Sequence, residues 1–265
     1  MNGTRLYYEV AGSGDPLVLM HGFSLDTRMW SPQWEAFSRR HQVIRYDLRG
    51  FGRSAIPKEK GYRHHDDLKA LLDWLGIPSA ALLGHSTGGS VALDFAVSHP
   101  EAVHALVLFG AIAHGYEFSP EFAAALQAIY GSAQAEGIAA AKRSWLRLLA
   151  FQPEDPGAED ELHRMVAEYS GWHWLNADPV QPREPPALGH LDTIRRPILT
   201  LLGERDVPDC HRIAAMVGQA VPAAEHVVLA GLGHMANLEA PARFNDTVLA
   251  FLTRSARDPG SPGPA

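Results

Sequence analysis

The sequence predicts an α/β fold in which helices cover both faces of a mostly parallel central sheet. Short, wholly apolar runs recur along the chain, and stretches with helical periodicity separate them. Polar or glycine-rich segments follow several of the runs. Because right-handed crossovers connect parallel strands, the carboxyl ends of these strands meet at one edge of the sheet, where ligands bind. The pattern therefore predicts one functional rim.

The first half of the chain supplies five expected strands and three helices. The strands cover residues 4–10, 16–20, 42–46, the apolar run that begins at Ala80, and 103–109. The helices are residues 29–39, with Trp30, Trp34 and Phe37 on one face, residues 66–75, which end before Gly76 as a C-cap, and a helix that follows Ser86 and runs towards His99.

The second half begins with an alanine-rich segment that is dotted with aromatic residues. Residues 112–188 favour several short helices, which we expect to form a lid over the rim. Strands at 196–203 and 225–229 and helices at 209–221 and 243–254 then complete the fold. We therefore expect a core of residues 1–111 and 189–255, a lid of 112–188 and a disordered tail of 256–265, which is rich in Pro, Gly and Ser.

Composition excludes several classes of protein. The 265 residues are 46% apolar and carry a net charge of -7, so no basic surface invites nucleic acid. The 14 histidines show no metal-ligand spacing, and His64-His65 is expected to be a solvated loop pair. The single cysteine, Cys210, cannot form an internal disulfide and is expected to be a packed small residue. The sequence shows no signal peptide and no membrane-spanning run, so we expect a cytoplasmic protein without a membrane partner.

One stretch has the pattern of a catalytic turn. Gly84-His85-Ser86-Thr87-Gly88 joins an apolar run to a helical pattern, as in a nucleophile elbow. The two glycines keep Cβ atoms out of a crowded turn, and the following helix brings unpaired N–H groups next to the hydroxyl. An ordinary tight turn is the alternative. A phosphate-binding loop is not, because no Gly-Lys-Ser/Thr follows.

A nucleophilic serine needs a base and a group that orients the base. His234 follows the last strand, and Asp206 follows the strand before it, so both lie on the rim. Asp206 has an alternative role as a cap of the next helix, although Asp209 is better placed to be that cap. Asp209 is also the fallback acid. Ser54 and Ser90 are rival nucleophiles, but neither lies at a strand-to-helix apex.

The oxyanion of such a reaction needs two donors. The backbone N–H groups of Thr87 and Phe23 are the candidates, since Phe23 follows Gly22 at another strand end. The neighbouring polar residues are expected to shape these loops rather than to react: His21, His85, Asp47 and Arg49.

Together these motifs resemble those of the lid-bearing α/β-hydrolases, which include carboxylesterases, enol-lactonases, C–C bond hydrolases and perhydrolases. The resembling pieces are His21-Gly22-Phe23, residues 47–54, the elbow, Gly203-Glu204-Arg205-Asp206 and Gly231-Leu232-Gly233-His234-Met235. The resemblance implies an α/β-hydrolase fold with a helical lid after the sixth strand. It also implies catalysis by Ser86, Asp206 and His234 without a cofactor or a metal.

The apolar, aromatic-rich lid favours a small, largely apolar carboxylic ester or lactone as substrate. Trp145, Trp172 and Met235 are the residues expected to contact it. Hydrolytic C–C cleavage of a vinylogous diketone is the alternative, and it would use a lid cation such as Arg143, Arg147 or Arg164. Perhydrolysis in the same site and a non-catalytic ligand receptor are further alternatives. The oligomeric state stays open.

Overall fold

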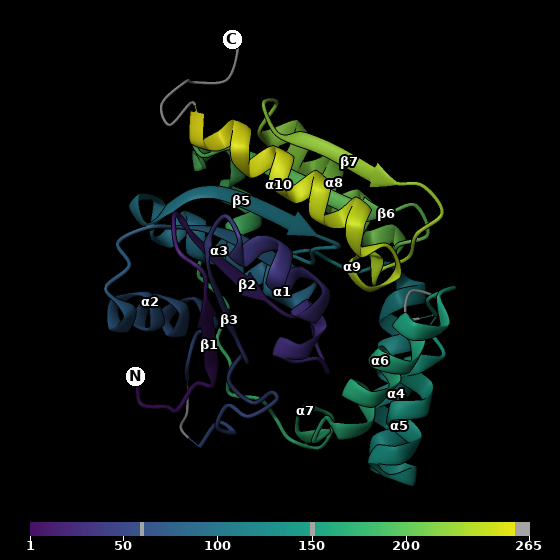
Figure 1. Cartoon of the computed structure of the whole chain (residues 1–265). Coiled ribbons are helices and arrows are strands. Elements are labelled where there is room, and N and C mark those ends of the chain that lie inside the picture. Colours follow the sequence, from purple (N-terminus) through teal and green to yellow (C-terminus); the bar gives the residue numbers. More distant parts are fainter. Residues whose placement is uncertain (59–60, 149–151, 258–265) are drawn as a thin grey trace.

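The computed structural model, which describes residues 1–58, 61–148 and 152–257, contains one seven-stranded sheet (Figure 1). Its strand order is β1-β3-β2-β4-β5-β6-β7. Only β1 is antiparallel, to β3, and the other neighbours are parallel, which confirms the predicted mostly parallel sheet. The strands are β1 (Tyr8–Ala11), β2 (Pro16–Met20), β3 (Gln42–Tyr46), β4 (Ala80–His85), β5 (Val103–Phe109), β6 (Ile198–Gly203) and β7 (Glu225–Leu229).

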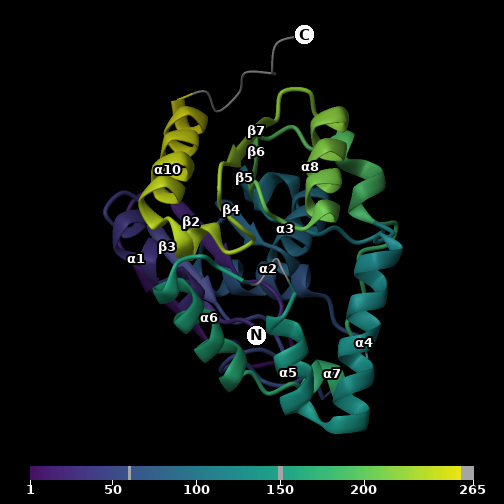
Figure 2. The same cartoon turned by 90° about the vertical axis from the view of Figure 1, so that its right-hand side faces the viewer.

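Helices cover both faces of the sheet, as the apolar runs require. Figure 2 shows α1 (Ser31–Ser38) and α10 (Pro241–Arg257) on one side, and α3 (Thr87–Ser98) and α8 (Pro208–Ala220) on the other. Every residue of β4 and of β6 is buried, because each lies between two helical layers. The helix α2 (His64–Leu75) packs against α3.

The start of α2 differs from the prediction. The helix begins at His64 rather than at residue 66, so the two histidines belong to its first turn. The expectation that His64-His65 is a solvated pair is wrong, since the residues are only 8% and 6% exposed. The predicted C-cap is confirmed, because Gly76 ends the helix in the left-handed conformation that glycine adopts without strain.

Between β5 and β6 the described residues form helices and no strand. Val180 of this segment makes an isolated bridge with Tyr62, which precedes α2. The helices gather at one end of the molecule, towards which the β5 and β7 arrows point (Figure 1). This helical insertion follows the fifth strand, so the predicted position after the sixth strand is wrong. Its helices are α4 (Pro120–Glu136), α5 (Ile138–Leu146), α6 (Pro156–Glu168), α7 (Trp172–Leu175) and the 3-10 segment Ala187–Thr193.

The C-terminal end also differs slightly from the prediction. The helix α10 continues to Arg257, so the first two residues of the expected tail are helical. Residues 258–265 lie outside the described part of the chain. Over the described ranges, no helix combines the length and the apolar character that crossing a membrane requires.

Gly203 allows β6 to meet the loop that carries His234. A Cβ atom on Gly203 would lie 2.2 Å from the carbonyl oxygen of Gly233 and 2.4 Å from that of Leu232. Since these atoms belong to backbone, they cannot move aside as a flexible side chain can. We expect Gly203→Ala to lower the free energy of unfolding by about 3 kcal/mol, measured by urea denaturation.

Gly218 offers the matched control within α8. A Cβ atom there would have no heavy atom within 4 Å. Because alanine restricts the unfolded chain, Gly218→Ala is expected to raise the free energy of unfolding by about 0.5–1 kcal/mol. If both substitutions changed the free energy of unfolding by the same amount, Gly203 would not be the crowded position that its neighbours indicate.

Candidate active site

Ser86 stands at a strained turn between β4 and α3. Its backbone has φ 51° and ψ -112°, a conformation that a residue with a side chain rarely adopts. The turn is held from both sides: the Ser86 N–H donates to the Phe109 carbonyl at 3.0 Å, and the Ser86 carbonyl accepts from Ile112 N–H at 3.2 Å. Ser86 is partly exposed, whereas the residues of β4 before it are buried. The strand, turn and helix of a nucleophile elbow are therefore present.

The two glycines of the motif lie where neighbouring backbone segments approach closely, as the sequence predicts. A Cβ atom on Gly84 would lie 2.2 Å from the Gly88 carbonyl oxygen, and one on Gly88 would lie 2.4 Å from that of Met20. The rival serines use their hydroxyls elsewhere. Ser54 Oγ donates to the Asp47 carbonyl at 2.6 Å, and Ser90 Oγ donates to the Thr87 carbonyl at 2.8 Å.

The structure joins the predicted base and acid. His234 Nδ1 and Asp206 Oδ1 are 2.6 Å apart, and their side chains are 2% and 0% exposed. Because the carboxylate accepts, Nδ1 carries the hydrogen, which leaves Nε2 as the basic nitrogen. Asp206 Oδ1 also accepts from the Val207 N–H at 2.7 Å, which fixes the orientation of the carboxylate.

His234 lies beside the elbow. His85, which precedes Ser86, donates from Nε2 to the His234 carbonyl at 3.0 Å, and the two rings are 4.4 Å apart. Burial and the neighbouring His234 lower the pKa of His85 well below its ordinary value, so the His85 ring is neutral. The structural role expected for His85 is thus confirmed: it ties the His234 loop to the serine turn.

The loop after β2 lies directly against Ser86. A Cβ atom on Gly22 would be 3.2 Å from Ser86 Cβ and 2.6 Å from His85 Nδ1, so only glycine fits there. The loop is held by His21, whose Nε2 accepts from the Leu48 N–H at 2.9 Å and whose Nδ1 therefore donates to the Gly22 carbonyl at 2.8 Å. Burial lowers the pKa of His21, which agrees with this neutral, supporting role.

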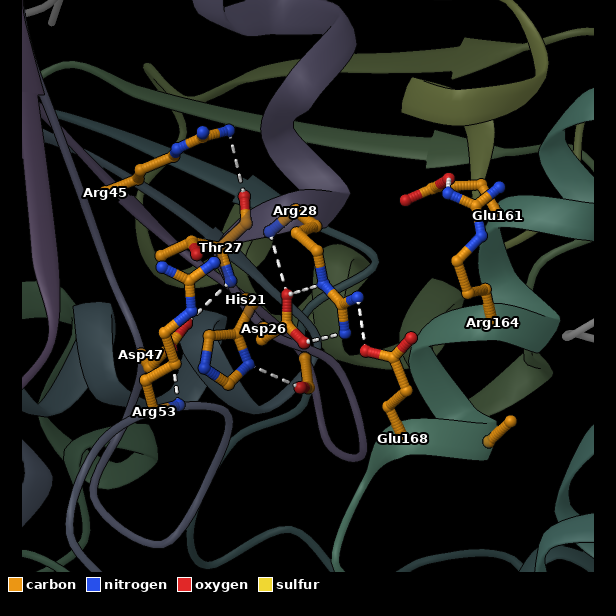
Figure 3. A network of polar contacts seen from close by, with 12 residues as sticks. His21, Asp26, Thr27, Arg28, Arg45, Asp47, Arg53, Glu161, Arg164 and Glu168 are labelled. Atoms are coloured by element: carbon orange, nitrogen blue, oxygen red, sulfur yellow. Dashed lines mark hydrogen bonds and ion pairs between the residues drawn. The ribbon is translucent and has the colours of Figure 1, made fainter.

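A polar network joins the segment after β2 to the loop after β3 (Figure 3). Asp47 accepts from the Thr27 N–H at 2.7 Å and from the Arg53 N–H at 2.8 Å, so it joins two loops as expected. Arg28 pairs with Asp26 at 2.7 Å and with Glu168 at 2.6 Å. Since Glu168 belongs to α6, this pair links the helical insertion to the core.

Aromatic side chains surround Phe23, the expected oxyanion residue. Its ring centroid lies 5.3–5.9 Å from five other rings. One of them belongs to the core and four to the insertion: Phe51, Trp145, Tyr169, His173 and Trp174. Of these residues, only Trp145 is among the substrate contacts predicted from the sequence. No spacing marks the others, because the contact depends on how the insertion folds back onto the core.

Two further predicted substrate contacts, Trp172 and Met235, and the fallback acid Asp209 lie outside the group of rings around Phe23. Trp172 is half-buried, with its ring edge-on to His173 at 5.0 Å. Met235 is fully buried in the core and therefore presents no accessible surface to a substrate here. Asp209 does not cap α8. Its carboxylate accepts instead from the N–H and hydroxyl of Ser119, each at 2.8 Å, and so fastens the start of the insertion.

The profile of the alpha/beta hydrolase fold family matches residues 15–151 of the chain. A 2-hydroxy-6-oxononadienedioate/2-hydroxy-6-oxononatrienedioate hydrolase of Paraburkholderia phymatum is 31% identical over 94% of this chain and 91% of its own. The chain belongs to the α/β-hydrolase family. It is a hydrolase enzyme of this superfamily.

Two solved structures resemble this α/β-hydrolase over nearly its whole length. A thermophilic esterase from Thermogutta terrifontis is 26% identical with a TM-score of 0.80, and covers 95% of this chain and 94% of its own. The enol-lactonase from Burkholderia xenovorans LB400 is 26% identical with a TM-score of 0.78, and covers 95% and 98%. The predicted fold class is therefore confirmed.

The histidine spacing in this α/β-hydrolase predicts no metal ligands, yet one group of described residues could hold a metal ion. Ligand atoms of Asp206, Cys210 and His234 all lie within 4.8 Å of one another. Burial and the nearby carboxylates of Asp206 and Asp209 raise the pKa of the Cys210 thiol well above its usual range. The thiol is therefore protonated, and it donates to the Gly110 carbonyl at 3.3 Å.

His173 of this α/β-hydrolase gives the fold a dependence on pH. Burial lowers its pKa from 6.5 to about 4. Between these values the unfolded chain binds a proton that the folded chain does not, so stability falls as the pH falls through this window. The loss reaches about 3 kcal/mol at its lower end.

We expect His173→Gln to flatten this dependence in urea denaturation at neutral and at mildly acidic pH. The flattening is partial, because burial also lowers the pKa of His64, to about 3. An unchanged slope in the variant would contradict the assignment.

Proposed function

We propose that this α/β-hydrolase is a serine hydrolase that cleaves a small, largely apolar carboxylic ester or lactone through an acyl-enzyme. The observation that carries the proposal is the 2.6 Å contact of His234 with Asp206 beside the strained turn of Ser86. The similarity to an esterase and an enol-lactonase supports the same reaction class. We assign Ser86 as nucleophile, His234 as base and Asp206 as the acid that orients the base.

The reaction then follows from these roles. Ser86 Oγ attacks the substrate carbonyl carbon while its proton passes to His234 Nε2, and Asp206 stabilises the imidazolium. The N–H groups of Phe23 and Thr87 donate hydrogen bonds to the oxyanion, and both residues are partly exposed beside Ser86. His234 returns the proton to the leaving alcohol. Water, activated by the same nitrogen, hydrolyses the acyl-enzyme and restores the Ser86 hydroxyl.

The substrate class follows from the surroundings of Phe23. Its neighbours in the insertion are rings that are 1–6% exposed, so the wall on this side is apolar apart from the polar edges of Tyr169 and His173. We therefore propose that residues 112–188 act as a lid that closes over the serine turn. We keep Trp145 as a substrate contact, since it lies against Phe23.

Hydrolytic C–C cleavage is the second candidate, because the relative from Paraburkholderia phymatum is named for a dioate substrate. The lid arginines do not favour it. Arg143, Arg147 and Arg164 are exposed. Arg147 donates to the Ser144 hydroxyl, and Arg164 forms an ion pair with Glu161. A cation that bound an anionic substrate would face the serine turn instead. We therefore place the ester or lactone first.

A substrate panel tests the proposal. Short aryl esters and simple lactones should be turned over at least tenfold faster, by kcat/KM, than a ring-fission diketone at equal concentration. About tenfold corresponds to 1.4 kcal/mol in the barrier, which an apolar rather than a cationic pocket readily supplies. Preferred cleavage of the diketone would assign the second candidate, and peroxide-dependent peracid formation that exceeds hydrolysis would assign perhydrolysis. Ligand binding without turnover of any substrate would assign a receptor.

A further inference from the structure

We propose that Asp206, Cys210 and His234 form an inhibitory binding site for a thiophilic divalent cation such as Zn²⁺ or Cd²⁺. The proposed reaction uses Asp206 and His234 but gives no role to Cys210. The three residues come from separate places: the loop after β6, the first turn of α8 and the loop after β7. Their ligand atoms nevertheless lie within 4.8 Å of one another, and all three residues are buried.

One oxygen of Asp206 lacks a strong donor. Asp206 Oδ2 is buried and has no nitrogen or oxygen donor among the described residues, and the group that approaches the carboxylate is the Cys210 thiol, a weak donor. Oδ1, in contrast, accepts from both Val207 and His234. A buried carboxylate oxygen without a strong donor is costly, and a bound cation would satisfy it.

Gly110 leaves space on the same side. The position that a Cβ atom would take on Gly110 lies 2.9 Å from Asp206 Oδ2 and 2.9 Å from His234 Nδ1, so no side chain separates the two atoms there. Cys210 Sγ approaches the same residue, 3.3 Å from the Gly110 carbonyl oxygen. The three ligand atoms therefore converge around Gly110.

The donor set is one that zinc and cadmium prefer. Thiolate sulfur, imidazole nitrogen and carboxylate oxygen bind Zn²⁺ at about 2.0–2.3 Å in tetrahedral sites. Such a site brings its ligand atoms to about 3.5 Å from one another. The ligand atoms here lie within 4.8 Å of one another, so the pair that is farthest apart has to approach by no more than about 1.3 Å around the ion. Water can take the fourth position. Hard cations such as Mg²⁺ prefer oxygen ligands and are not expected to bind.

Metal binding at this place would stop catalysis directly. The ion displaces the hydrogen from His234 Nδ1 and from the Cys210 thiol, and both protons pass to the solvent. The contact between Nδ1 and Asp206 is then replaced by bonds to the metal. His234 loses the orientation and the charge stabilisation that a general base for Ser86 requires. Zn²⁺ should therefore inhibit without occupying the substrate pocket, that is, without competing with the ester.

The single cysteine of the chain makes the site directly observable. The whole protein is titrated with Cd²⁺, and the thiolate-to-cadmium charge-transfer absorption is recorded in the ultraviolet. We expect one equivalent of Cd²⁺ to produce the band, and Cys210→Ala and the near-isosteric Cys210→Ser to abolish it. Asp206→Asn should weaken Cd²⁺ binding by about 10- to 100-fold. This readout does not depend on turnover, so it distinguishes failure of the site from failure of the proposed function.

Inhibition by Zn²⁺ provides the second readout. The concentration for half-inhibition of ester turnover should rise by about 10- to 100-fold in Cys210→Ala. His163→Ala is the matched control, because His163 is an exposed histidine 3.8 Å from Glu159 and should leave inhibition unchanged. The site is overturned if the Cd²⁺ band is absent at inhibitory concentrations, or if the band titrates equally in Asp206→Asn. Inhibition that persists in Cys210→Ala but is lost in His163→Ala would also overturn it.

Discussion

Ser86→Ala is expected to lower kcat for an ester substrate by about 10⁵-fold, close to the effect of removing a whole triad. Without the hydroxyl, no acyl-enzyme forms, and His234 has no proton to remove from a nucleophile. The fold should survive, because the strained turn is held by backbone hydrogen bonds of Ser86 to Phe109 and Ile112 that alanine can also make.

A serine far from the site gives the control for this substitution. Ser255 Oγ donates to the Phe251 carbonyl in α10, and Ser255→Ala should keep full activity. Steady-state kinetics with an aryl ester measures both variants. A Ser86→Ala enzyme that keeps a tenth or more of the turnover would contradict the role of Ser86. A comparable loss in Ser54→Ala or Ser90→Ala, with Ser86→Ala active, would assign another nucleophile.

Asp206→Ala is expected to lower kcat by about 10⁴-fold, since the orientation and the charge stabilisation of His234 are lost together. Asp206→Asn should keep more activity than Asp206→Ala. The reason is the Val207 N–H, which donates to Oδ1 and so holds the amide oxygen of asparagine at that position. That oxygen can still accept from His234 Nδ1, and only the negative charge is removed.

Asp209→Asn separates the two candidate acids. Asp209 accepts from Ser119 and Tyr116 and lies in the first turn of α8, so its substitution should loosen the start of the insertion but keep most of kcat. Steady-state kinetics of the three variants, with unfolding curves as a check on folding, gives the comparison. A loss in Asp209→Asn that equals the loss in Asp206→Ala would make Asp209 the acid.

The sequence predicted what local chemistry determines. Ser86 and Asp206 each follow a buried apolar strand, and His234 follows the edge strand β7. Parallel strands carry their ends to one edge whatever the chain does between them. The glycines on both sides of Ser86 could also be interpreted from the sequence, since a turn in which backbone segments lie this close leaves no space for a Cβ atom. These features depend on short segments, and the structure brings His234 and Asp206 to 2.6 Å as the strand order implies.

The features that were missed depend on contacts between distant segments. His64 and His65 look like polar loop residues, but α2 begins at His64 and packs against α3, which buries them. His173 approaches Phe23 only because the insertion folds back onto the core, and no spacing in the sequence encodes that contact. Cys210 lies in the first turn of α8, and Asp206 lies in the loop just before this helix, so the two side chains come close. The sequence gives this proximity a meaning only once the role of Asp206 is known.

The central claim is that Ser86 is the nucleophile of an acyl-transfer reaction, and active-site labelling tests it most directly. The whole enzyme is treated with a fluorophosphonate, digested and mapped by mass spectrometry. We expect one adduct per chain, on the peptide that contains Ser86, and no adduct in Ser86→Ala. Full ester turnover by an enzyme that carries no adduct, or an adduct on Ser54 or Ser90 with Ser86 unmodified, would contradict the claim.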